Sequence, residues 1–96
     1  MPQNQDSFTA QATLVNALGL HARSAIKIAR VAQRAGAGVQ VAYGKTAADA
    51  TSVIDILTLA CPAGETLKFT IEAPEDYDIL QALVDLVNDG FGELPE

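Results

Sequence analysis

The sequence has very little of several residue types, and each shortage excludes a class of protein. A single cysteine, Cys61, excludes an internal disulfide framework and is expected to be a small apolar residue at a helix end. The histidine, cysteine and carboxylate ligands of a metal site are not clustered at a suitable spacing. No apolar run approaches the ~20 residues that span a bilayer, and the N-terminus lacks the basic and apolar regions of a signal peptide. We therefore expect a cytoplasmic protein with no metal site and no direct membrane insertion.

Basic residues are also scarce, and their placement is uneven. The 96-residue chain has a net charge of -6, which argues against a nucleic-acid partner. Eight of the twelve acidic residues lie from Glu72 onward. Four of the six basic residues share one side of a predicted helix: Arg23, Lys27, Arg30 and Arg34. Such a stripe is either a solvated face or a docking face for an acidic partner.

Hydrophobic periodicity predicts four strands and three helices in a single domain over 1–96. The strands are expected near 8–15, 39–43, 46–50 and 66–73. The helices are expected from Ala22 to the glycines at 36 and 38, over 52–60, and from Pro74 to Gly90. We expect 1–6 to be a flexible N-terminal tail and 91–96 a C-terminal tail. The order β-α-β-β-α-β-α indicates an α+β fold, with one antiparallel sheet that carries all the helices on one face.

His21 is the main candidate for chemistry. It precedes the first helical turn, whose free N–H groups and macrodipole disfavour an imidazolium and leave the ring neutral and nucleophilic. The same N–H groups form an anion site, and Arg23 can add charge-assisted hydrogen bonds to a phosphoryl group. The alternative is that His21 only caps a helix.

Two segments, "NALGLHARSA" and "KTAADATSVIDILTL", closely resemble the histidine-containing phosphocarrier (HPr) family of the bacterial phosphotransferase system. The resemblance covers 8–88. It implies an open-faced β-sandwich with strand order 1-4-2-3. It also implies that His21 accepts a phosphoryl group on Nδ1 from enzyme I and passes it to an enzyme IIA component in sugar uptake, with Arg23 steadying the phosphate. The chain would then be a cosubstrate of phosphotransferases rather than an independent enzyme, and would need no cofactor. We expect a monomer.

Two serines need separate interpretation. Ser24 stands where the family has proline, and we expect either that Ser24→Pro modestly raises stability or that Ser24 contacts the phosphate or a partner. Ser52 is an N-cap candidate at a position that a dedicated kinase phosphorylates in some family members. The N-cap interpretation is favoured, because the basic residue usual before that serine is missing.

Surplus apolar residues near His21 predict a docking patch. It consists of Ile26, Val53, Ile54 and Leu57, with Arg23, Lys27 and Arg30 at its rim. Three other functions stay open. One is a regulatory module that binds a transcriptional regulator or a serine kinase/phosphorylase, and another is a carrier for nitrogen regulation or dihydroxyacetone phosphorylation. The third is a small α+β interaction domain with an incidental histidine.

Overall fold

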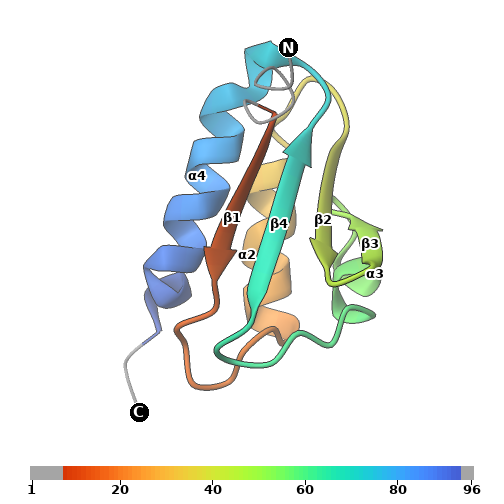
Figure 1. The fold of residues 1–96 in the computed structure, drawn as a ribbon. Coiled ribbons are helices and arrows are strands. Elements are labelled where there is room, and N and C mark those ends of the chain that lie inside the picture. Colours follow the sequence, from red (N-terminus) through yellow and green to blue (C-terminus); the bar gives the residue numbers. More distant parts are fainter. Residues whose placement is uncertain (1–7, 94–96) are drawn as a thin grey trace.

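The computed structural model describes residues 8–93, which form one four-stranded sheet covered by helices (Figure 1). The strands are β1 (Thr9–Thr13), β2 (Val39–Tyr43), β3 (Thr46–Asp49) and β4 (Thr66–Ile71). The helices are α2 (Ala22–Ala32), α3 (Val53–Leu57) and α4 (Tyr77–Asn88), with short 3-10 turns η1 (Pro74–Asp76) and η2 (Gly90–Gly92). All strand pairs are antiparallel, in the order β1-β4-β2-β3. The predicted fold and strand order are confirmed.

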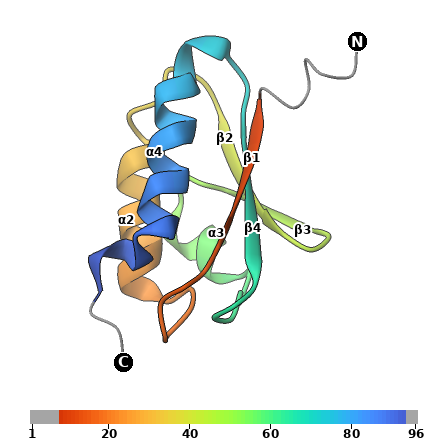
Figure 2. The ribbon, with the colours of Figure 1, turned by 60° about the vertical axis from the view of Figure 1, so that its left-hand side comes forward.

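The molecule has two layers, with the helices on one side of the sheet and the other side open (Figure 2). The alternation in β4 turns Leu67, Phe69 and Ile71 toward the helices, and all three are buried. From α2 and α4, Ile28 and Leu83 meet them in the core. Within 8–93, no helix has the length and apolar character needed to cross a membrane.

The helix boundaries differ from the predicted ones at two places. Helix α2 ends at Ala32, before the glycines expected to stop it. The chain beyond it is held by the buried carboxylate of Asp76, which accepts the N–H groups of Gly36 and Ala37 at 2.9 and 3.0 Å. The helix expected to begin at Pro74 starts instead with the 3-10 turn η1, and its regular part begins at Tyr77.

The end of the chain departs from the expected C-terminal tail over 91–96. Phe91 is buried in the main core with only 1% of its surface exposed, and Glu93 is partly buried. Residues 91–93 are therefore part of the fold and lie beside the start of α2. The tail expected over 1–6 and the segment 94–96 lie outside the described residues.

Candidate functional site

His21 is the N-cap residue of α2, as the sequence predicts. Its backbone is extended (φ -140°, ψ -178°), and its carbonyl accepts the first intrahelical hydrogen bond, from Ala25 N–H at 2.8 Å. The Nδ1 atom accepts a hydrogen bond from the Arg23 backbone N–H at 3.2 Å. The ring therefore lies against the free N–H groups of the helix, where a negatively charged group on Nδ1 would be stabilised.

The turn before His21 depends on a glycine. Gly19 has φ +67°, and a Cβ at this position would lie 2.6 Å from the Ala63 backbone nitrogen. Next to it, Leu20 N–H donates to the Cys61 carbonyl at 3.0 Å. The close approach of the segment before α2 to the segment after α3 fixes the point at which His21 enters its helix.

Ser24 has a structural task at this helix start. It is fully buried, and its Oγ accepts the His21 backbone N–H at 2.9 Å. The hydroxyl also lies 3.0 Å from the His21 carbonyl, to which it can donate. This is the side-chain half of a capping box, in which the third helical residue satisfies the backbone of the N-cap residue. The Ser24 hydroxyl therefore faces the backbone of His21, and contact of the phosphate with the Ser24 backbone N–H stays a prediction.

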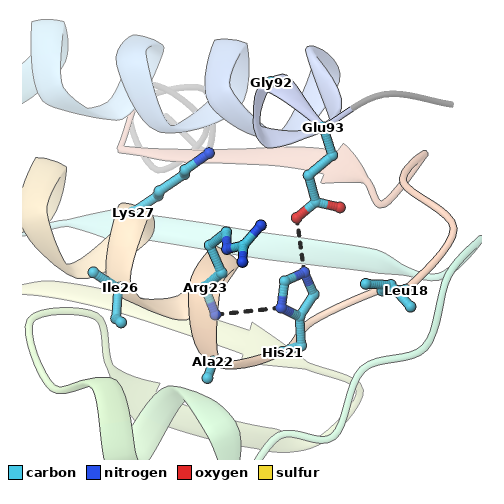
Figure 3. Close-up of a pocket in the computed structure, with 8 residues that line it drawn as sticks. All are labelled: Leu18, His21, Ala22, Arg23, Ile26, Lys27, Gly92 and Glu93. Atoms are coloured by element: carbon cyan, nitrogen blue, oxygen red, sulfur yellow. Dashed lines mark hydrogen bonds and ion pairs between the residues drawn. The ribbon is translucent and has the colours of Figure 1, made fainter.

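The opposite side of the ring meets Glu93, which the sequence interpretation missed. His21 Nε2 lies 2.7 Å from Glu93 Oε2, although the two residues are 72 positions apart (Figure 3). Both side chains are partly exposed, at 26% for His21 and 16% for Glu93. Because a carboxylate only accepts hydrogen bonds, Nε2 carries the proton and donates it. Nδ1, which accepts from Arg23 N–H, keeps its lone pair. The two contacts together favour the Nε2–H tautomer of the ring.

Two further residues hold the Glu93 segment in place. Asn16 Nδ2 donates to Glu93 Oε1 at 3.1 Å and to the Gly19 carbonyl at 2.8 Å. Lys27 Nζ donates to the carbonyl of Phe91. Burial acts to raise the pKa of Glu93, but hydrogen bonds from His21 and Asn16, together with the positive charges of a protonated His21 and of Lys27, lower it more, so the net shift is downward. Glu93 is therefore held as a carboxylate beside the ring.

The ring borders a hollow between the start of α2 and the segment that carries Gly92 and Glu93 (Figure 3). Arg23 lies beside the ring in the first turn of α2, and its side chain is exposed. Among residues 8–93, no group of three or more histidine, cysteine or acidic side chains is arranged to hold a metal ion. The residues that line the hollow are Leu18, His21, Ala22, Arg23, Ile26, Lys27, Gly92 and Glu93.

The predicted apolar patch is only partly on the surface. Ile54 is strongly exposed (77%), whereas Ile26 and Leu57 are exposed by 38% and 37%. Val53 is partly buried and packs against the core. Leu18, at 70% exposed, adds an apolar side chain at the rim of the hollow that the predicted patch did not include.

The predicted polar residues around the patch are used in different ways. Arg30 is exposed on the same helix as Arg23. The ammonium of Lys27, in contrast, donates a hydrogen bond to the Phe91 carbonyl. Ser52 is the N-cap of α3, and its Oγ accepts Asp55 N–H at 3.3 Å. A capping box with hydrogen bonds in both directions is formed at the start of α2, between His21 and Ser24.

Comparison with known proteins agrees with the fold and the helix start. The family model described as "PTS HPr component phosphorylation site" matches residues 8–89. The phosphocarrier protein HPr of Pseudomonas aeruginosa is 37% identical over 82 residues, which cover 84% of this chain and 91% of that protein. The phosphocarrier protein NPr of Shewanella violacea is 35% identical over 83 residues, covering 86% and 91%.

Solved structures give the same result. The crystal structure of HPr-C-His from Thermoanaerobacter tengcongensis superposes with a TM-score of 0.83, at 28% identity, and covers 90% of this chain and 97% of that one. The chain therefore belongs to the HPr family, the phosphocarriers of the phosphotransferase system. The family match ends at residue 89, before Glu93.

Proposed function

We propose that His21 is the phosphorylated residue and that Nδ1 is the atom that forms the bond. The observation that carries this proposal is the pair of contacts on the ring: a donor from Arg23 at Nδ1 and a carboxylate at Nε2. The lone pair of Nδ1 attacks the phosphorus of a phosphorylated donor. The new N–P bond forms as the bond from phosphorus to the donor breaks, and the leaving atom keeps the electron pair. The proton on Nε2 stays in place.

The start of α2 then accommodates the phosphate. The Arg23 backbone N–H donates to Nδ1 in the unphosphorylated protein. When Nδ1 is phosphorylated, this N–H becomes available to a phosphate oxygen. Oxyanions are stabilised at this end of an 11-residue helix by the macrodipole and the free N–H groups. The exposed Arg23 guanidinium supplies bidentate hydrogen bonds to the same oxygens. Arg23 is thus proposed to stabilise the phosphate both through its backbone and through its side chain.

The proposed partners are enzyme I as donor and an enzyme IIA component of sugar uptake as acceptor. The docking surface consists of Ile26, Ile54 and Leu57, with Arg23 and Arg30 at its edge, beside the hollow that contains the ring. An apolar centre with a charged rim is typical of transient interfaces. In this proposal the protein works in the cytoplasm, with Ser52 acting as a helix cap. Phosphorylation of Ser52 is the less favoured alternative, which kinase labelling tests, and the monomeric state remains a prediction, which sedimentation equilibrium tests.

A carrier role in nitrogen regulation is a second candidate. It is supported by similarity to proteins named NPr, at 35% identity to those of Shewanella violacea and Klebsiella oxytoca. The two candidates share the chemistry at His21 and differ only in the donor and acceptor proteins.

Incubation with phosphoenolpyruvate and enzyme I tests the chemistry. We expect one acid-labile, base-stable phosphate, assigned to Nδ1 by ³¹P–¹⁵N correlation, and no labelling of His21→Ala. Circular dichroism of His21→Ala checks that its fold is kept. Labelling of His21→Ala at the normal rate, or a phosphate on Nε2, refutes the proposal.

A second assay separates the two candidate pathways. The phosphorylated protein is offered in parallel to a sugar-specific enzyme IIA and to a nitrogen-branch enzyme IIA. Faster transfer to the sugar-specific acceptor is expected. The reverse preference assigns the chain to nitrogen regulation.

A further inference from the structure

Glu93 stands apart because it reaches the site from the far end of the chain. Its Oε2 meets His21 Nε2, and its Oε1 accepts from Asn16 Nδ2, so both carboxylate oxygens have a partner. The helix-start signal that identifies His21 contains no information about this contact. Neither does the family match, which ends at residue 89.

Two unfavourable local features surround this carboxylate. Asn16 is buried (6% exposed), and its Oδ1 is the only buried side-chain nitrogen or oxygen in the described part of the chain that has no hydrogen-bond partner. Phe91 has φ +60°, a left-handed conformation that a non-glycine residue rarely adopts. Unsatisfied polar atoms and backbone strain are concentrated at functional sites. Here the strained Phe91 lies two residues before Glu93, and the amide group of the incompletely satisfied Asn16 binds Glu93 directly.

We propose that Glu93, oriented by Asn16, is a positioning residue that keeps the His21 proton on Nε2 and stabilises the phosphorylated ring. The inference rests on the proposed function, because it concerns the same phosphoryl transfer. Its consequence is thermodynamic as well as geometric. Glu93 sets how strongly the carrier holds its phosphoryl group.

The physical argument concerns charge on the ring. A bond from Nδ1 to phosphorus withdraws the lone pair, and with a proton on Nε2 the ring becomes cationic. A carboxylate 2.7 Å from Nε2 stabilises this cation more than it stabilises the neutral ring. Before transfer, the same hydrogen bond keeps the proton away from Nδ1, so every ring presents its lone pair to the donor. Glu93 thus favours both acceptance and retention of the phosphoryl group.

Replacement by glutamine separates hydrogen-bond orientation from charge. If the carbonyl of the introduced amide accepts from His21 Nε2–H, the NH2 group of that amide faces the NH2 group of Asn16. If the amide flips, its NH2 group faces Nε2, so Nε2 must be the acceptor and the ring proton moves to Nδ1. The proton on Nδ1 then faces the Arg23 backbone N–H, which loses its acceptor. Neither orientation satisfies all partners, so Glu93→Gln should populate both tautomers.

Two measurements test the proposal on the full-length chain. ¹⁵N NMR of the histidine ring at about pH 8, where an ordinary imidazole is neutral, reports the tautomer without any phosphorylation. The phosphorylated fraction at a fixed phosphoenolpyruvate-to-pyruvate ratio with enzyme I reports the equilibrium constant. Glu75→Gln is the matched control, because Glu75 is exposed on η1, at the end of the molecule away from the start of α2 (Figure 1).

We expect wild type and Glu75→Gln to show only the Nε2–H form and equal equilibrium constants. Glu93→Gln should show both tautomers and an equilibrium constant about tenfold lower, which corresponds to about 1.4 kcal/mol. An unchanged tautomer or an unchanged equilibrium constant in Glu93→Gln overturns the proposal. If wild type takes up no phosphate from either a sugar-branch or a nitrogen-branch enzyme I, the proposed function fails, and the NMR result still decides whether Glu93 positions the ring.

Discussion

Removing the Ser24 hydroxyl tests the capping geometry at the start of α2. In Ser24→Ala the His21 N–H loses its acceptor at 2.9 Å, in a position where the replaced side chain is fully buried. Loss of a buried hydrogen-bond partner costs about 1–3 kcal/mol, and loss of a helix cap about 0.5–2 kcal/mol, so we expect a loss of about 1–2 kcal/mol. In a domain of this size, 1 kcal/mol corresponds to roughly 4–8 °C in melting temperature.

The contacts of the Ser24 hydroxyl change the expected sign of the stability effect of Ser24→Pro. Proline lowers the conformational entropy of the unfolded chain, which raises the free energy of unfolding by about 0.4–1 kcal/mol. The same substitution also removes the capping hydroxyl. We therefore expect Ser24→Pro to melt below wild type, with phosphoryl transfer at His21 within a few-fold of normal. Ser52→Ala is the control, because it removes an exposed cap with a 3.3 Å bond and should cost less. A melting temperature of Ser24→Ala equal to that of wild type refutes the capping argument.

Two further predictions concern charge. Arg30→Glu should slow association with enzyme I at low salt, and stopped-flow measurements should show the difference fading as salt rises, since an exposed charge is screened beyond about 10 Å at 0.1 M salt. The lowered pKa of Glu93 means that its contribution to stability is fully present above the ordinary glutamate value of about 4.3 and is lost as pH falls through the lower folded value. Thermal melts should therefore show wild type more stable than Glu93→Gln at neutral pH, and the difference should shrink in acid; a difference that is constant with pH contradicts this.

The features that sequence predicted correctly are local ones. The alternation around Phe69 defines a strand with one buried face, and the change to helical spacing after His21 defines the start of α2. The N-cap position of Ser52 follows from its chemistry and from the apolar residues after it. These signals lie within a few residues of the feature that they predict, so an unaligned sequence is enough to find them.

The features that sequence missed depend on tertiary packing. The contact between Glu93 and His21 joins residues 72 positions apart, and no spacing rule links them. A signal was present in "GFGE", where an aromatic between two glycines suggests a buried anchor rather than a tail. All three residues before Glu93 have positive φ, and this sharp turn brings the carboxylate back to the ring. The end of α2 was also misplaced: the chain tightens into i→i+3 hydrogen bonds directly after Ala32, and Asp76 from a distant segment then binds the N–H groups of Gly36 and Ala37.

The docking surface should control the rate of phosphoryl transfer, whereas the Glu93 carboxylate should control its equilibrium constant. The equilibrium constant for phosphoryl transfer depends only on the free phosphorylated and unphosphorylated proteins, so contacts made only in the complex cancel from it. Ile54, at 77% exposed, touches the partner in our proposal and lies outside the lining of the hollow that contains the ring. Ile54→Asp should therefore lower the rate of transfer from enzyme I tenfold or more and leave the final phosphorylated fraction unchanged. Glu93→Gln should change that final fraction even when enzyme I is in excess. Quenched-flow time courses followed to completion measure both quantities, and a changed end point for Ile54→Asp would show that this side chain acts on the ring itself.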